Sequence, residues 1–125
     1  MTFNKKIYLS PPHLTGQEIN YIKEALDTNW VSPYGSNIDA FEKQLETHFG
    51  VSDVALLSSA TAAIHLALIA SGIGKNDEVI CPTLNFVGSV NPVLYVQAQP
   101  ILIDCDPSNY NIDPKIIEEA RQCGL

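Results

Sequence analysis

From residue 54 onward, short apolar segments alternate with helical segments, and this order restricts the possible folds more than any other feature of the sequence. Strands are expected at 54–57, 79–81 and 101–104, with helices at 62–70 and 86–96 between them. The strand segments do not alternate polar and apolar residues, which is typical of strands covered on both faces. Helical crossovers join parallel strands. The sequence therefore predicts an α/β fold with helices around a mainly parallel sheet.

Two helices are expected before the first strand. Residues 15–18 have the form of a capping box, in which Thr15 and Glu18 satisfy each other's free backbone N–H groups, and the helix should run to about Thr28. A second capping pattern at 36–39 predicts a helix that ends before Gly50.

The last expected element is a helix that begins at Asp113 and Pro114 and ends near Cys123 and Gly124. A sheet with only about three strands would leave at least one edge unprotected. We therefore expect residues 1–125 to be the N-terminal segment of a longer protein. A complete small α/β domain is the alternative that the length permits.

The composition excludes several classes of function. There are 14 acidic residues against 7 Lys and Arg, which gives a formal net charge of −7, and no basic cluster occurs that would bind nucleic acid or an anionic membrane surface. The three cysteines are far apart and lack the spacing of a disulfide framework or a metal site. Because no apolar run is long enough for a signal peptide or a membrane span, a cytoplasmic protein is expected.

Two positions could form a ligand site. Ala60 and Thr61 follow an expected strand and enter a helix, where backbone N–H groups and the Thr61 hydroxyl could hold a phosphate. Serine and threonine are also favoured as helix caps with nothing bound, so this alternative stays open. Phe86, after the next strand, could stack on a flat cofactor ring or fill the core.

No catalytic residue can be assigned from the remaining polar side chains. His65 lies in an apolar helix without a metal-ligand partner, so a packed histidine is expected. Asp104 and Asp106 flank Cys105 and are expected to cap the turn into Pro107 rather than to form an acid–base pair.

Several short motifs occur together along almost the whole chain. They are SATAAIHLAL at 59–68, GIG at 72–74, DEVI at 77–80, NFV at 85–87, NPVLY at 91–95, Pro100 and ID at 103–104. In this combination the chain resembles the N-terminal part of DegT/StrS-type sugar aminotransferases. These are pyridoxal phosphate (PLP) enzymes of the aspartate-aminotransferase fold, fold type I. The motifs at 9–13, 30–35 and 103–113 are most similar to members that make bacillosamine-type sugars.

The resemblance implies an enzyme that moves an amino group, with glutamate as donor, to a nucleotide-linked 4-keto-6-deoxy sugar. It also implies a homodimer. Ala60 and Thr61 match the positions that bind the PLP phosphate, and Phe86 matches the position that stacks on the pyridine ring. Most relatives have Gly where this chain has Ala60, so the backbone there must accommodate a Cβ atom.

Trp30, Pro33 and Tyr34 match the family's substrate-side loop near the subunit interface. The alternative is that they only anchor two helices. The family's Schiff-base lysine would lie beyond Leu125, so this chain alone is predicted to be inactive. A PLP-dependent sugar dehydratase of the same fold, with His in place of that lysine, remains a second possibility. A non-catalytic α/β binding module is the third.

Overall fold

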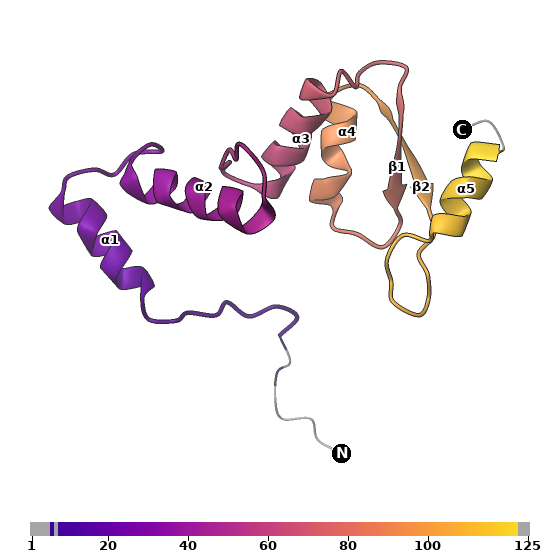
Figure 1. Ribbon diagram of the computed structural model, residues 1–125. Coiled ribbons are helices and arrows are strands. Elements are labelled where there is room, and N and C mark those ends of the chain that lie inside the picture. Colours follow the sequence, from indigo (N-terminus) through magenta and orange to yellow (C-terminus); the bar gives the residue numbers. More distant parts are fainter. Residues whose placement is uncertain (1–5, 7, 123–125) are drawn as a thin grey trace. The chain divides into compact units, whose positions relative to one another are not determined.

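The computed structural model describes residue 6 and residues 8–122 of the chain (Figure 1). The chain consists of two compact units, Met1–Leu56 and Leu57–Leu125. The first unit contains two helices. The second contains a small parallel sheet with its surrounding helices.

The helices of the first unit are α1 (Glu18–Asp27) and α2 (Ser36–Phe49). Half of the predicted capping box forms, because the Thr15 N–H donates to Glu18 Oε1 at 2.8 Å. The other half does not form, since Thr15 Oγ1 accepts a hydrogen bond from the Gln17 N–H at 3.3 Å and its hydroxyl donates to Glu18 Oε1 at 2.9 Å. The helix itself begins at Glu18, two residues later than the capping box implied, and Glu18 Oε2 accepts a hydrogen bond from the Gly16 N–H at 2.8 Å in the turn that precedes it. Helix α2 ends at Phe49 and is capped by Gly50, whose left-handed φ of 67° is a conformation that glycine adopts without strain.

The second unit is built on two parallel strands. Its elements are α3 (Ala60–Ala70), β1 (Glu78–Pro82), the 3₁₀ helix η1 (Val87–Ser89), α4 (Asn91–Tyr95), β2 (Gln99–Ile103) and α5 (Pro114–Gln122). The register places Glu78 opposite Gln99 and Pro82 opposite Ile103. The expected α/β fold with helices around a parallel sheet is thereby confirmed.

Two expected elements differ from the structure. Residues 54–57 do not join the sheet, because the Leu56 N–H donates to Glu42 Oε1 at 3.0 Å instead of to a neighbouring strand. The helix expected at 86–96 is divided into η1 and α4. Phe86 has an extended backbone, and Pro92 has no N–H with which to continue a helix from the preceding turn.

The buried core of the second unit lies where α3 and α4 meet the strands. Cys81, Val93 and Ala98 are buried together, and they are surrounded by the half-buried side chains of Leu68, Ile73, Val79, Val90 and Val96. Helix α3 contacts α4, and α4 contacts β2 (Figure 1). Burial raises the pKa of the Cys81 thiol above its ordinary value.

Helix α5 begins as the sequence predicts. Asp113 precedes the first residue, Pro114, and its Oδ1 accepts a hydrogen bond from the Lys115 N–H at 2.9 Å. The expected end of this helix near Cys123 and Gly124 lies outside the described residues. Within the described part of the chain, no helix has the length and apolar character needed to cross a membrane.

Candidate functional site

The start of α3 presents free backbone donors. Ser59 has an extended backbone and caps the helix, because its Oγ accepts a hydrogen bond from the Ala62 N–H at 3.1 Å. Ala60 and Thr61 come first in the helix, so their N–H groups have no partner within it. The positive end of the helix dipole and these two donors favour an anion at this point.

Gly88 brings the Thr61 hydroxyl and the Phe86 ring close together. A Cβ atom added at Gly88 would lie 2.8 Å from Thr61 Oγ1 and 3.0 Å from the Phe86 ring. Both groups therefore lie directly against the Gly88 backbone. Gly88 was not among the predicted site residues, although a small residue two positions after Phe86 could have indicated a close approach.

The Phe86 side chain is not part of the core. Its exposed fraction is 79%, and its segment follows the carboxyl end of β1. The backbone on both sides is fixed, because the Phe86 N–H donates to Asn85 Oδ1 at 2.7 Å and the Ser89 hydroxyl donates to the Phe86 carbonyl at 2.8 Å. An exposed ring on a fixed backbone can offer a flat face to a ligand beside the start of α3.

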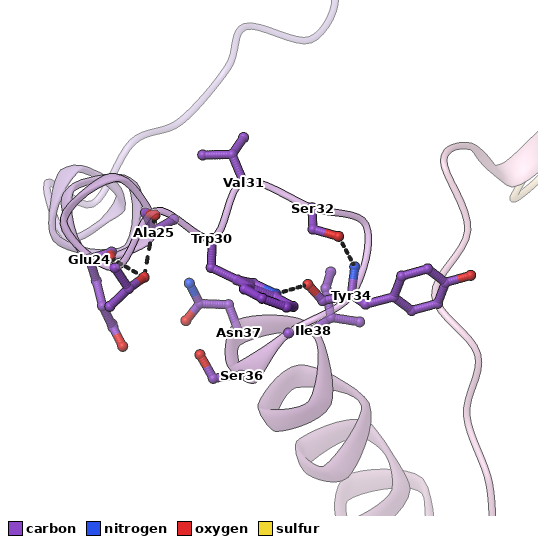
Figure 2. A pocket seen from close by; sticks show the side chains of 11 residues that line it. Glu24, Ala25, Trp30, Val31, Ser32, Tyr34, Ser36, Asn37 and Ile38 are labelled. Atoms are coloured by element: carbon purple, nitrogen blue, oxygen red, sulfur yellow. Dashed lines mark hydrogen bonds between the residues drawn. The ribbon is translucent and has the colours of Figure 1, made fainter.

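The loop between α1 and α2 surrounds a pocket of about 190 Å³ (Figure 2). Trp30 Nε1 donates a hydrogen bond to the Tyr34 carbonyl across this loop. Gly35 has a φ of 138°, and a Cβ atom there would overlap with the Trp30 ring. The Trp30 indole thus packs against the Gly35 backbone at the start of α2.

The three loop residues singled out from the sequence contribute unequally to this pocket. Trp30 and Tyr34 line it, whereas Pro33 is not among the lining residues. Figure 2 shows the Tyr34 phenol ring pointing away from the indole, so Tyr34 meets Trp30 through its backbone carbonyl. No separate role was predicted for Gly35, although the Trp30 ring lies directly against its backbone.

His65 and Asp106 have the structural roles that the sequence predicts, whereas Asp104 Oδ1 accepts from the Cys105 N–H and the Thr83 hydroxyl. The ring of half-buried His65 packs edge-on against Tyr95, with 5.4 Å between centroids. Asp106 Oδ1 accepts from the Ser108 N–H and hydroxyl at 2.8 and 2.6 Å, and these hydrogen bonds, the hydroxyl's first, lower the pKa of Asp106. Among the described residues, no group of three or more potential metal ligands occurs.

The fold and the site together describe an α/β chain with a helix N-terminus and an exposed aromatic ring near the carboxyl end of a parallel strand. The chain belongs to the DegT/DnrJ/EryC1/StrS aminotransferase family, whose model matches residues 12–121. The family prediction made from the motifs is thereby confirmed.

Two curated relatives are similar over most of the chain. EpsN of Bacillus subtilis (strain 168), assigned as a pyridoxal phosphate-dependent aminotransferase, is 45% identical over 119 residues, which are 95% of this chain and 31% of EpsN. GDP-perosamine synthase of Caulobacter vibrioides is 42% identical over 113 residues, which are 90% of this chain and 30% of the synthase. The chain thus spans about a third of the length of these relatives.

A solved structure agrees with the fold. NtdA from Bacillus subtilis, with bound cofactor PMP, matches with a TM-score of 0.77 and 36% sequence identity. The match covers 94% of this chain and 29% of NtdA.

Proposed function

We propose that residues 1–125 are the N-terminal segment of a PLP-dependent aminotransferase that moves an amino group from glutamate to a nucleotide-linked 4-keto-6-deoxy sugar. The observation that carries the proposal is the family match over residues 12–121. The names of the relatives point in the same direction, since EpsN is assigned as a PLP-dependent aminotransferase and another relative is a GDP-perosamine synthase.

The residues at the start of α3 fit the phosphate and ring of PLP. The free N–H groups of Ala60 and Thr61, together with the Thr61 hydroxyl, would hold the phosphate, and Phe86 would stack on the pyridine ring. Gly88 supports this fit, because its missing Cβ leaves the hydroxyl and the ring close together. Bound PLP supplies an electron sink for charge that develops at the amino-bearing carbon.

Ala60 is compatible with this role. It is the first residue of α3, and its backbone does not have the positive φ that would favour glycine. A phosphate held there is bound by backbone N–H groups, which alanine and glycine both possess.

The Trp30–Gly35 loop is proposed to border the substrate. The Trp30 ring and the Tyr34 carbonyl fix one side of the pocket, and the exposed Tyr34 phenol is free to contact a ligand. Pro33 would act by restricting the loop rather than by lining the pocket. Any polar group of the nucleotide-linked substrate that is enclosed here must find a hydrogen-bond partner, which is a physical basis of selection among nucleotide-linked substrates.

The finer assignment is a UDP-linked 4-keto-6-deoxy-N-acetylhexosamine. It rests on the motifs at 9–13, 30–35 and 103–113. We further propose a cytoplasmic homodimer that binds neither membranes nor nucleic acid, consistent with the formal net charge of −7 and the absence of a basic cluster in the sequence.

The test is an amination assay on the full-length protein with PLP and glutamate, comparing UDP-linked and dTDP-linked 4-keto sugars by product mass. We expect the UDP-linked N-acetylhexosamine to be aminated and residues 1–125 alone to give no product. Preference for the dTDP-linked sugar would reject the finer assignment. A product that has lost an oxygen function without gaining nitrogen would favour the dehydratase.

The cofactor site is tested by Thr61→Val, which removes the hydroxyl and keeps the shape of the side chain. Loss of a hydrogen bond to a charged group should weaken PLP binding about 10-fold or more. The matched control is Thr83→Val, since Thr83 Oγ1 donates to Asp104 at 3.4 Å and has no proposed contact with PLP. Equal PLP affinity of the two variants, measured by equilibrium dialysis, would remove Thr61 from the site.

A further inference from the structure

A second pocket, here called the Tyr110 pocket, lies near the carboxyl end of β1 and has a volume of about 480 Å³. Its lining residues are Pro82, Leu84, Asn85, Tyr110, Asn111 and Ile112. Pro82 is the last residue of β1, Leu84 and Asn85 belong to the segment that leads from β1 to Phe86, and the others belong to the loop that follows β2. The pocket therefore shares a chain segment with the proposed cofactor site.

Tyr110 is held in an unfavourable conformation. Its φ of 62° is left-handed, which a bulky residue rarely adopts. The loop enforces this conformation, because the Tyr110 N–H donates to the Asp106 carbonyl at 2.7 Å and the Asp106 N–H donates to the Asn111 carbonyl at 2.8 Å. The Asn111 N–H also donates to Asn109 Oδ1 at 2.8 Å.

Burial of the aromatic ring does not compensate for this strain. The exposed fraction of Tyr110 is 65%, and that of Leu84 across the pocket is 60%. Strained backbone conformations cluster at functional sites, among them ligand-binding sites. The loop therefore presents the Tyr110 ring at the pocket instead of burying it.

The side chains that line the Tyr110 pocket indicate which class of ligand it could bind. None of the six residues is charged, so the pocket offers no cation for a phosphate or for the carboxylates of an amino acid. Asn85 Oδ1 already accepts the Phe86 N–H, which leaves the Asn85 amide group as a donor, and Asn111 adds a second amide. Aromatic and apolar surface beside two amides suits a ring that has an apolar C–H face and a rim of hydroxyl groups.

We propose that the Tyr110 pocket binds a hexopyranose ring, with the sugar on the Tyr110 ring and its hydroxyl or acetamido groups hydrogen-bonded to Asn85 and Asn111. This inference rests on the proposed function, in which the substrate carries such a sugar. It assigns the sugar, and not the nucleotide or the amino donor, to the loop between β2 and α5.

The test measures binding without catalysis, by saturation-transfer NMR on the full-length protein loaded with PLP. The probes are UDP-N-acetylglucosamine and UDP. Tyr110→Phe keeps the ring, whereas Tyr110→Gly removes it and relieves the left-handed strain. We expect hexose signals to persist in Tyr110→Phe and to fall at least about fivefold in Tyr110→Gly, while the uridine signals of both probes stay within about twofold.

Hexose signals that are unchanged in Tyr110→Gly, or absent from the wild-type protein, would overturn the proposal. Thermal unfolding of each variant shows whether it is folded, and Tyr110→Asn replaces Tyr110→Gly if the glycine variant does not fold, because asparagine also tolerates positive φ. A protein that binds the hexose through Tyr110 but aminates no sugar would keep this pocket and reject the proposed function. A protein that aminates the sugar but binds the hexose independently of Tyr110 would keep the proposed function and reject this pocket.

Discussion

The two units of the chain use their apolar residues differently. In the first unit, Ile19, Ile22 and Leu26 recur at helical spacing on α1, yet their exposed fractions are 63%, 55% and 62%. In the second unit, Val93 and Cys81 are only 1% and 5% exposed. Neither α1 nor α2, both within the described residues, contains a buried residue.

This contrast shows that helical periodicity and core formation are separate requirements. An apolar stripe predicts a helix, but burial also needs a second surface. In the second unit, the crossover between β1 and β2 brings α4 against β2 and supplies that surface. In the first unit, α1 and α2 contain no buried residue, and local hydrogen bonds such as those between Thr15 and Glu18 are present instead.

Placing a carboxylate in each unit tests whether the two units differ in how far they depend on buried apolar side chains. Val93→Asp puts an unpaired charge in the core and should destabilise the second unit by at least about 4 kcal/mol. Ile22→Asp on exposed α1 should cost less than about 1 kcal/mol. Amide hydrogen exchange of β1 and β2, read by mass spectrometry, measures the first effect, and that of α1 measures the second. Similar costs at the two sites would show that α1 has a core of its own.

A second comparison, within the first unit, separates backbone strain from side-chain overlap. Gly35→Ala should cost about 2 kcal/mol, because the Gly35 conformation is nearly exclusive to glycine and the new Cβ would displace the Trp30 ring. Gly16→Ala is the matched control, since Gly16 has a φ of 88° but no atom within 4 Å of the added Cβ.

Trp30 is the single tryptophan of the 125 residues, so the tryptophan fluorescence of the chain reports directly on the contact between the Trp30 ring and the Gly35 backbone. Gly35→Ala should shift the emission to longer wavelength and increase quenching by acrylamide, whereas Gly16→Ala should leave both unchanged. An unchanged spectrum in Gly35→Ala would mean that Gly35 does not hold the indole.

The smallest expected effect is the loss of the Glu18 hydrogen bonds at low pH. Hydrogen bonds from the Thr15 N–H first, then from the Glu18 N–H and the Thr15 hydroxyl, lower the pKa of Glu18 from 4.5 to about 2. Because the pKa is lower in the folded chain, this stabilisation is present above about pH 4.5 and is lost as the pH falls towards 2. Carboxyl ¹³C NMR should show Glu18 titrating near 2 in the wild-type chain.

Thr15→Ala provides the control for this titration. It removes the hydroxyl donor and keeps the backbone donor, so the pKa of Glu18 should rise but stay below 4.5. A wild-type Glu18 that titrates at its ordinary value would show that the turn before α1 is not formed in solution.

The elements of the second unit were largely predictable because their signals are local. Asp113 followed by Pro114 indicated the start of α5, and the alternation of apolar strands with helices indicated a parallel sheet. The strand expected at 54–57 was wrong, since strand formation depends on a neighbour and Leu56 bonds to Glu42 instead. Sequence patterns carry little information about such a long-range partner.

The candidate site was predictable only in part. Ala60, Thr61 and Phe86 were identified from their place after strands and from the family motifs. Gly88 and Gly35 were not, because their contribution is a missing Cβ at a close approach, and only the fold shows what approaches them. The left-handed backbone of Tyr110 was not predicted either, since it follows from hydrogen bonds of a loop that sequence periodicity does not describe.

The two-stranded sheet also bears on self-association. Each strand pairs with its neighbour on one side, and its other backbone edge is open within the described residues. Such edges can recruit strands from other molecules and start aggregation. Pro82 and Pro100 lie within β1 and β2, and each removes one N–H donor from its strand. Each proline leaves fewer backbone donors for a strand that pairs at either outer edge, whether that strand belongs to another molecule or to the longer protein proposed above.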